Sequence, residues 1–365
     1  MKILIIYATA GAGHRRAAEA IYEGFCANTN WDVTLIDALD YTNPFHKSFY
    51  SGSYTFLITR FPGVWGIVFN LVNLPILVPL VSQLRRILHT VVAGRLNRFL
   101  EEGKFDYIFT THFLANEVAS HLKKTGKIRS QLITVITDFD IHRMWLADAV
   151  DRYAVASDWT KEKMKQLGVA DDKSVVTGIP IHPKFMASKD KTEIRRRIGL
   201  QDGIFTVLIA TGSFGIGPIE QVIETARGCQ VIVVCGHNKD LYYRLSQAKG
   251  SEKLVKVLGL VNNMEELMAV ADIMISKPGG LSIAEALVNG LPLIFFNAIP
   301  GQEVGNVKVL KKYGIGIDSQ NIKDIKTALD HLKECPEDMR DIQEKIKTLA
   351  QPNAVRDIIA LVTKP

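Results

Sequence analysis

The sequence predicts an α/β protein built from two doubly wound domains. Three observations support this prediction: the length of 365 residues, the alternation of short apolar runs with amphipathic runs, and the glycine-rich turns that follow several apolar runs directly. The length is that of about two ordinary domains. The composition, 47% hydrophobic and 22% charged, is typical of a globular chain and excludes a disordered or collagen-like one.

Apolar runs in both halves of the chain are predicted to be parallel strands, because strands covered by helices on both faces are apolar throughout. In the first half these runs occupy 1–8, 32–38, 107–112, 132–139 and 152–157. In the second half they occupy 205–212, 229–236, 256–261, 273–277 and 292–297. Helices are predicted at 14–28, at 263–272 and at 337–365, the last with a break before Pro352. The polar stretch 182–195 is the predicted linker between the two domains.

The net charge of +6 comes from one segment. Residues 41–100 contain no Asp or Glu and six basic residues, namely Lys47, Arg60, Arg85, Arg86, Arg95 and Arg98. The same segment holds an uncharged apolar stretch at 61–84, which is long enough to span a bilayer but is interrupted by three prolines. We interpret it as a segment that lies on an anionic membrane surface. A core helix with a basic exposed face is the alternative.

The start of the chain and its cysteines indicate the compartment. The first apolar run enters a glycine turn and has the features of neither a secretory signal nor a transit peptide. Four cysteines without paired spacing are typical of free thiols in a reducing environment. We expect a bacterial cytoplasmic protein that is peripheral on the inner face of the cell membrane.

A first candidate site follows the first predicted strand, where Gly11, Gly13 and His14 stand in a row of four residues. Glycine permits a tight turn into a helix whose first amides can bind an anion. A dinucleotide fingerprint needs a small residue where Arg16 stands, and no GKS or GKT is present, so neither NAD binding nor an ATPase-type phosphate loop is supported. His14 is a candidate general base. A capping or solvent-facing histidine is the alternative.

A second candidate site is the loop 137–145, which follows the fourth predicted strand. Asp138 lies at the strand end, with His142 and Trp145 close by in sequence. The spacing of Asp138 and Asp140 could bind a divalent metal or form a turn. We expect Asp138 to accept or orient a proton, and we expect no metal site. Trp145 is either a core residue or a platform for an acceptor.

Glycine turns in the second half predict a phosphate site. Gly212 and Ser213 belong to a turn with three glycines, and Gly279 and Gly280 precede a predicted helix. Amides at such turns can hold a diphosphate.

The residues that follow these turns can bind sugars. Ser282 lies in the first turn of the predicted helix, and Glu285 one turn further can reach ribose hydroxyls. Gln302 and Glu303 can bind the hydroxyls of a sugar. A capping box or a surface loop would explain each motif alone, but their order and spacing together are more specific.

Together these motifs resemble those of the monogalactosyldiacylglycerol synthases and processive diacylglycerol β-glycosyltransferases. This family belongs to glycosyltransferase family 28 and is related to the N-acetylglucosaminyltransferase of the peptidoglycan lipid pathway. The similarity spans nearly the whole chain through GAGH at 11–14, FPGVW at 61–65, TDF…H..W at 137–145, GIPIHPKF at 178–185, CGHN at 235–238, GLVNNMEELM at 259–268, KPGGLSIAEA at 277–286 and PGQEVGN at 300–306.

The resemblance implies a GT-B fold, in which two Rossmann-like domains face each other across a cleft. Residues 1–185 would form the acceptor and membrane-binding domain, and 186–345 the UDP-sugar-binding domain. Residues 346–365 would form a C-terminal helix that packs back on the first domain.

The resemblance also assigns residues to the two substrates. The implied donor contacts are Leu260, Val261 and Met264 for uracil, Gly279, Gly280, Leu281 and Ser282 for the diphosphate, Glu285 for the ribose, Gln302 and Glu303 for the hexose, and Gly212, Ser213, Gly236 and Lys277 around them. The implied acceptor side consists of Gly13, His14, Asp138, His142 and Trp145, with Pro62 and Trp65 in the lipid-docking segment.

The implied activity is inverting transfer of a galactose or glucose from a UDP-sugar to diacylglycerol at the membrane surface. His14 or Asp138 would be the base, UDP-sugar would be a co-substrate, and no other cofactor is expected. The expected partners are the UDP-hexose, diacylglycerol and anionic membrane lipids, without nucleic acid. The alternatives are a UDP-GlcNAc transferase acting on a polyprenyl-diphosphate lipid, a UDP-sugar 2-epimerase, and a non-catalytic membrane-bound nucleotide-sugar sensor.

Overall fold

The computed structural model describes residues 1–363 except 10, 43–46, 48–51, 54–55, 58–59, 73–92, 213–214, 216 and 249–253. It divides into two compact units. Unit 1 comprises Met1–His182, Ile299–Gly305 and Asn353–Pro365, and unit 2 comprises Pro183–Ala298 and Asn306–Pro352.

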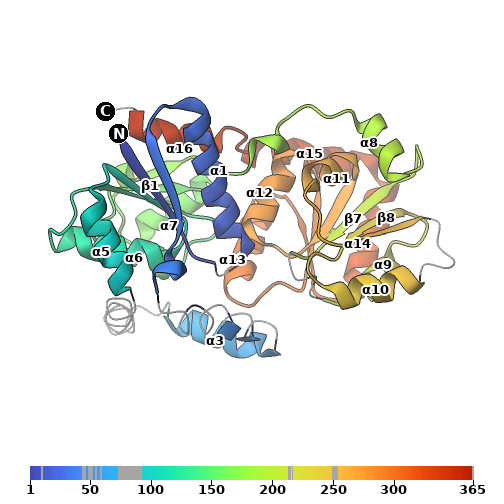
Figure 1. The fold of residues 1–365 in the computed structure, drawn as a ribbon. Coiled ribbons are helices and arrows are strands. Elements are labelled where there is room, and N and C mark those ends of the chain that lie inside the picture. The colour runs from blue at the N-terminus through green and yellow to red at the C-terminus, as the bar shows by residue number, and fades with distance from the viewer. Residues whose placement is uncertain are drawn as a thin grey trace. The chain divides into compact units, whose positions relative to one another are not determined.

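Unit 1 is a parallel sheet with the strand order β2-β1-β3-β4-β5-β6, covered by helices on both faces (Figure 1). Its strands are β1 (Lys2–Tyr7), β2 (Asp32–Asp37), β3 (Tyr107–Thr110), β4 (Gln131–Val135), β5 (Arg152–Val155) and β6 (Ser174–Val176). Its α-helices are α1 (Ala12–Asn28), α3 (Pro62–Val72), α5 (Gly94–Gly103), α6 (Phe113–Lys124), α7 (Asp158–Gln166) and α16 (Ala354–Thr363). Short 3-10 turns are η1 (Ala38–Tyr41), η2 (Arg143–Trp145) and η3 (Asp171–Lys173).

The core of unit 1 follows from the two-residue period of β1, because successive side chains of a strand point to opposite faces. Ile3 and Ile5 pack with residues of α1 and α16, whereas Leu4 and Ile6 pack with residues of α5 and α6. The last helix is held tightly: a Cβ at Gly24 of α1 would lie 2.3 Å from Val355 Cγ1 of α16. The carboxyl-terminal helix therefore covers one face of the first sheet.

Unit 2 is a second parallel sheet, with the strand order β12-β11-β10-β7-β8-β9. Its strands are β7 (Thr206–Ala210), β8 (Gln230–Val234), β9 (Val255–Leu258), β10 (Ile273–Ser276), β11 (Leu293–Phe296) and β12 (Ile317–Ser319). Its helices are η4 (Pro183–Phe185), α8 (Lys191–Ile198), α9 (Ile219–Thr225), α10 (Lys239–Ala248), α11 (Met264–Val270), α12 (Gly280–Val288), α13 (Gln302–Lys312, whose first residues belong to unit 1), α14 (Ile322–Glu334) and α15 (Pro336–Leu349). Residues of β7, β8 and β10 are buried throughout.

The predicted α/β class with two doubly wound sheets is confirmed. Each apolar run that we predicted to be a strand is a strand, and the tail is broken into α15 and α16 around Pro352. The edge strands β6 and β12 were missed, because each has three residues of which two are half-buried, and neither forms an apolar run. The boundary between units falls at His182, and segment 299–305 belongs to unit 1, so the units differ from the expected ranges 1–185 and 186–345.

Candidate functional site

The first candidate site lies where the strand order of the first sheet reverses. The chain runs from β1 to β2 on one side and continues with β3 on the other side of β1, so β1 and β3 flank the switch point. Open α/β sheets bind ligands at this point, beyond the carboxyl ends of the strands. His14 lies in the first turn of α1, which follows β1, and the loops after β3 and β4 carry His112 and Asp138 respectively.

His14 is fixed by residues of these neighbouring loops. Its Nδ1 lies 2.9 Å from Thr137 Oγ1, and its carbonyl accepts a 2.9 Å hydrogen bond from Thr111 Oγ1. Its ring meets that of His112 edge-on at 4.8 Å between centroids, and it lies 5.9 Å from the Trp145 ring. The capping alternative for His14 is not what the structure shows, because Gly11, with φ +113°, is the residue that precedes α1 and its cap carries no side-chain bond.

Burial lowers the pKa of His14 to about 4, with the Thr111 contact acting in the opposite direction. Removing a cationic imidazolium from water disfavours the charged form. At neutral pH the imidazole is therefore uncharged, which is the form that can accept a proton.

The two aspartates of the loop 137–145 have different environments. Asp138 is 6% exposed and adjoins Thr137, the hydroxyl partner of His14. Asp140 forms an ion pair with Lys163 of α7, and one of its carboxylate oxygens accepts the Ile141 N–H at 2.9 Å. Asp140 therefore has a cationic partner from α7, whereas Asp138 is buried next to Thr137, the residue that contacts His14.

His142 and Trp145 are both buried, and each is held by a defined partner. His142 Nδ1 accepts the Met144 N–H at 3.1 Å, so Nε2 carries the proton and donates it to the Phe69 carbonyl of α3 at 2.9 Å. The Trp145 carbonyl accepts a 2.8 Å hydrogen bond from the Asn116 side chain. Trp145 thus lies near His14, His142 is tied to α3, and the acceptor role of both residues stays a prediction.

Helix α3 exposes an apolar row that consists of Val64, Ile67, Val68 and Leu71. Their exposed fractions are 50%, 63%, 46% and 46%. A core helix would bury this row, so the core-helix alternative is wrong for α3. Trp65 and Phe69 lie on the less exposed side of the helix, with ring centroids 6.0 Å apart. The Pro62 side chain, Arg85 and Arg86 lie outside what the structure describes.

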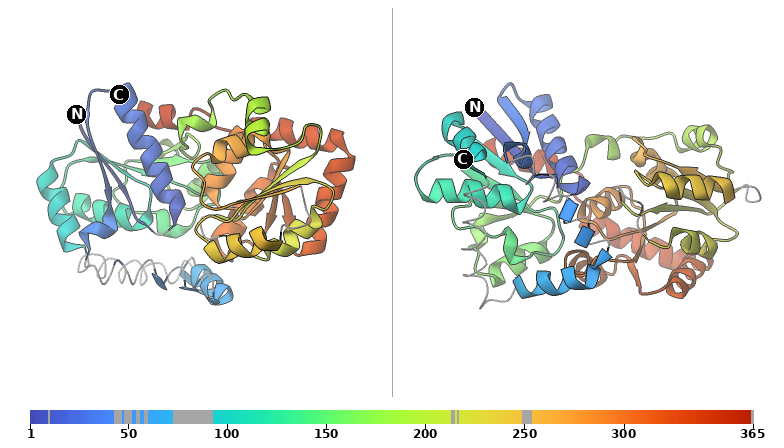
Figure 2. Two further views of the ribbon diagram at one scale, coloured as in Figure 1. Left: turned by 45° about the vertical axis from the view of Figure 1, so that its right-hand side comes forward. Right: turned by 60° about the horizontal axis from the view of Figure 1, so that its bottom comes forward.

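In the part of the chain that the structure describes, no helix has the length and apolar character that a membrane crossing requires. Helix α3 has 11 residues and is seen in light blue at the bottom of both views in Figure 2.

The second candidate site lies at the corresponding switch point of the second sheet, between β7 and β10. The turn 277–279 joins β10 to α12, and Gly279 precedes the helix without any side-chain cap. The Ser276 hydroxyl donates to the Ala210 carbonyl at 2.7 Å, and the Asn306 side chain donates to the Pro278 carbonyl at 2.9 Å. The turn is thus held from two sides, while a Cβ built at Gly279 meets nothing within 4 Å.

The residues predicted for the diphosphate and ribose share the first turns of α12. Gly280 and Leu281 are buried, Ser282 is half-buried and Glu285 is 4% exposed. The first backbone amides of a helix lack intrahelical partners and can bind an anion. Lys277 is half-buried on the turn that precedes them.

The loops after β7, β8 and β9 bring the other predicted donor residues to the same edge of the second sheet. Gly215 approaches the Cys235 carbonyl so closely that a Cβ would lie 2.6 Å from it, and Gly212 and Gly236 have positive φ. After β9, Leu260 is exposed, whereas Val261 and Met264 are half-buried. Ser213 lies outside the described residues.

Gln302 and Glu303, the residues implied for the hexose, belong to the other unit. They belong to segment 299–305, which the structure assigns to unit 1. Glu303 Oε2 accepts the Ile299 N–H at 2.7 Å, and the Gln302 side chain is not described. The resemblance placed both residues in the range 186–345, whereas the structure assigns them to unit 1, and their role toward the hexose stays a prediction.

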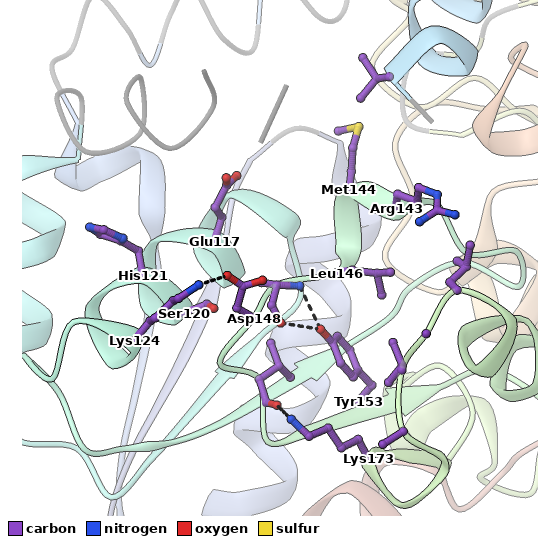
Figure 3. Close-up of a pocket in the computed structure, with 17 residues that line it drawn as sticks. Glu117, Ser120, His121, Lys124, Arg143, Met144, Leu146, Asp148, Tyr153 and Lys173 are labelled. Atoms are coloured by element: carbon purple, nitrogen blue, oxygen red, sulfur yellow. Dashed lines mark hydrogen bonds and ion pairs between the residues drawn. The ribbon is translucent and has the colours of Figure 1, made fainter. Parts of the chain in front are cut away.

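A pocket of about 480 Å³ lies elsewhere in unit 1, between α6, η2 and the residues before β5 and β6 (Figure 3). Lys124 and Asp148 form an ion pair at its wall, and Lys173 donates to the Val150 carbonyl at 2.9 Å. None of the predicted site residues lines it, although Arg143 and Met144 come from the same loop as His142. This pocket is not the site that the sequence predicts.

One group among the described residues has the chemistry of a metal site, formed by His331, Cys335 and Asp338 at the junction of α14 and α15. His331 Nε2 and Asp338 Oδ2 are 2.6 Å apart. The group lies on helices at the surface of unit 2 and not on the loops at the carboxyl edge of its sheet. The expectation that the reaction needs no metal stays a prediction.

Sequence reasoning missed His112, Thr137 and Phe69 as parts of the first site. His112 ends the third predicted strand, and strand neighbours at a switch point are a usable signal for it. Thr137 is part of the loop 137–145, but no role was predicted for it. Phe69 reaches His142 from 73 positions away, and no local pattern indicates that contact.

Two family descriptions match consecutive parts of the chain. Residues 14–181 match monogalactosyldiacylglycerol (MGDG) synthase, and residues 206–360 match the glycosyltransferase family 28 C-terminal domain. A processive diacylglycerol beta-glucosyltransferase of Bacillus pumilus (strain SAFR-032) is 30% identical, over 98% of this chain and 93% of that protein. The chloroplastic monogalactosyldiacylglycerol synthase 1 of Arabidopsis thaliana is 28% identical, over 98% of this chain and 70% of that protein.

Solved structures share the fold over the full length. UDP-GlcNAc 2-epimerase from Neisseria meningitidis has a TM-score of 0.65 at 14% identity, covering 100% of both chains. MurG of Acinetobacter baumannii has a TM-score of 0.63 at 14% identity, also covering 100% of both chains.

The two parallel sheets and the matched domains define a glycosyltransferase of the GT-B fold that uses a UDP-sugar. Within that class, the chain belongs to the family of monogalactosyldiacylglycerol synthases and processive diacylglycerol glucosyltransferases. The family and the fold that the sequence predicted are confirmed.

Proposed function

We propose that the protein transfers a hexose from a UDP-hexose to the free hydroxyl of diacylglycerol at a membrane surface, with inversion at the anomeric carbon. The acceptor oxygen forms a bond to that carbon while the bond from carbon to the UDP oxygen breaks. The acceptor proton passes to a base of the first site, and UDP departs with the electron pair. The match of the whole chain to diacylglycerol glycosyltransferases is the observation that carries this proposal.

The second site has the features that UDP requires. Free amides at the start of α12 and the glycine turn before it can stabilise the charge that develops on the departing diphosphate. Glu285, buried one turn further, can accept hydrogen bonds from the ribose hydroxyls. Leu260, Val261 and Met264 offer apolar surface to uracil at the same sheet edge.

The first site supplies the base. His14 is neutral at physiological pH, and its Nδ1 faces Thr137, which leaves Nε2 as the nitrogen for the acceptor proton. Asp138 is the other candidate, either as the base itself or as the group that orients the acceptor. A base with a pKa of about 4 is weak in the free protein, so His14 works best when a carboxylate stabilises the imidazolium that forms.

The apolar row of α3 supports attachment to a membrane surface. Exposed apolar side chains on one helix gain free energy when they enter the lipid interface. The six basic residues of 41–100, without any acid, favour an anionic leaflet. We assign the protein to the cytoplasmic face of the membrane on this basis.

A labelled-sugar experiment tests the proposal. The purified protein is incubated with radiolabelled UDP-glucose or UDP-galactose and with phosphatidylglycerol vesicles that contain diacylglycerol, and the extracted lipids are separated. We expect a labelled monohexosyl lipid with one donor, and none from vesicles that lack diacylglycerol.

Parallel reactions with UDP-GlcNAc cover the alternatives. Label on a polyprenyl-diphosphate lipid, or conversion to the 2-epimer without any lipid product, would contradict the proposal if no hexosyl-diacylglycerol forms.

A further inference from the structure

Segment 299–305 rests on α3, the helix that carries the exposed apolar row. A Cβ at Gly66 would lie 2.6 Å from Pro300 Cβ, so only glycine permits this approach. On the next turn of α3, the Phe69 ring lies against Gly301, where a Cβ would come within 2.5 Å of Cδ1. Gly301 has φ +92°, a conformation that a larger residue rarely adopts.

Further contacts tie the same segment to the first site. A Cβ at Gly305 would lie 2.6 Å from Asp140 Oδ2, in the loop that carries Asp138 and His142. His142 donates to the Phe69 carbonyl at 2.9 Å, and its ring centroid is 4.0 Å from that of Phe69. Within the segment, Glu303 bonds the Ile299 N–H. Segment 299–305 is therefore packed against both α3 and the 137–145 loop.

We infer that α3 positions the hexose-reading segment, and that Gly66 and Phe69 are positioning residues for the donor hexose. The inference rests on the proposed function, in which Gln302 and Glu303 contact the hexose and UDP is held by unit 2. Neither Gly66 nor Phe69 touches the donor in this scheme. They act by setting where Pro300 and Gly301, and with them Gln302 and Glu303, lie.

The consequence is a link between membrane attachment and sugar recognition. One side of α3 presents Val64, Ile67, Val68 and Leu71, and the other side supports segment 299–305. A change on the supporting side should alter affinity for the hexose part of the donor while leaving affinity for UDP unchanged.

The test compares two glycines of the same helix. Gly66→Ala adds a Cβ that pushes against Pro300, whereas Gly63→Ala adds one where nothing lies within 4 Å. Alanine favours helix formation at both positions, so folding of α3 is not the expected point of failure. Calorimetry gives the affinities for UDP and for the UDP-hexose, and steady-state kinetics with diacylglycerol vesicles give KM and kcat.

We expect Gly66→Ala to raise the KM for the UDP-hexose about tenfold, as a displacement of contact groups does, with UDP affinity within twofold of the wild type. Gly63→Ala should leave both values unchanged. Phe69→Ala should act like Gly66→Ala, and Phe69→Leu, which keeps apolar bulk against Gly301, should restore part of the loss.

Two outcomes would overturn the inference. One is a folded Gly66→Ala protein with the wild-type KM for UDP-hexose, and the other is an equal loss of UDP and UDP-hexose affinity. Failure of the proposed function is separate from both, because it would appear as an absence of hexosyl lipid with the wild-type protein.

Discussion

At the carboxyl edge of the first sheet, the candidate site consists mainly of side chains. At the same edge of the second sheet, it consists largely of backbone groups in glycine turns. Around the first switch point, the His112 and Trp145 rings lie within 6 Å of the His14 ring, and His14 itself contacts Thr111 and Thr137. Around the second, Gly212 and Gly236 lie in turns with positive φ, and Gly279 precedes α12, whose first backbone amides lack intrahelical partners. Equivalent positions in two similar topologies thus offer proton chemistry in one unit and anion binding in the other.

This difference predicts which kind of substitution should affect each unit. In the first unit, the loss of one ring should stop the reaction without disturbing the nucleotide. In the second unit, the proposed diphosphate contacts are backbone amides, which replacement of a side chain leaves in place, so the buried Glu285 is a side chain through which the site can be tested. The predictions below separate the two edges, from the largest expected effect to the smallest.

His14→Ala should lower turnover about 10²- to 10⁴-fold, because it removes the group that accepts the acceptor proton. The affinity for UDP should stay within twofold of the wild type, since the proposed nucleotide site lies in unit 2. Single-turnover kinetics and UDP calorimetry measure the two quantities. His121→Ala, which removes a half-buried histidine of α6, is the control. Wild-type turnover in a folded His14→Ala protein would leave Asp138 as the base.

Stability should depend on pH through the same residue. The His14 pKa is about 4 in the folded protein and about 6.5 in the unfolded chain, so the unfolded state binds a proton first as the pH falls. The contribution of neutral His14 to the stability of the folded state is fully present above pH 6.5 and is lost as the pH falls through 4. It amounts to at most about 3 kcal/mol of unfolding free energy.

Urea unfolding at a series of pH values from 7 to 4 measures this dependence. His14→Gln, which cannot titrate, should show a shallower decline over that range than the wild type. Parallel declines for the two proteins would mean that His14 keeps an ordinary pKa and that its site is wetter than the geometry indicates.

The contrast between the two edges also decides how much of the site the sequence could predict. Apolar runs such as that of β1 are a local signal, and a loop at the end of a strand must lie at the carboxyl edge of a parallel sheet. Positions such as Gly279 and His14 were predictable for that reason. The three-residue strands β6 and β12 carry no such run, and the contact between Gly66 and Pro300 joins segments that no local pattern relates.

At the second edge, Glu285→Ala should weaken UDP binding by about 1.5–3 kcal/mol, because a charged acceptor is lost from the ribose. This corresponds to a drop of roughly 10- to 150-fold in affinity, measured by calorimetry. Glu285→Gln keeps the shape of the buried side chain, so its UDP affinity should lie between those of the wild type and Glu285→Ala. A folded Glu285→Ala protein with unchanged UDP affinity would remove the ribose assignment.

The smallest effect concerns α3, the region that belongs to neither edge but supports segment 299–305. Ile67 has 63% of its surface exposed, and transfer of such a side chain to lipid yields up to about 2 kcal/mol. Ile67→Ser should therefore reduce co-sedimentation with phosphatidylglycerol vesicles by up to about thirtyfold in partition coefficient.

Tyr243→Ser is the matched control for α3, since it removes an exposed aromatic side chain from α10 of unit 2. Because the loss at Ile67 is apolar, raised salt should weaken wild-type binding but should not reproduce the difference between the variant and the wild type. Ile67 is exposed, whereas Gly66 faces Pro300, so the KM for UDP-hexose measured with a short-chain diacylglycerol in solution should be unchanged. Equal sedimentation of Ile67→Ser and wild type would show that the apolar row does not contact the membrane. The remaining role of α3 would then be to support segment 299–305.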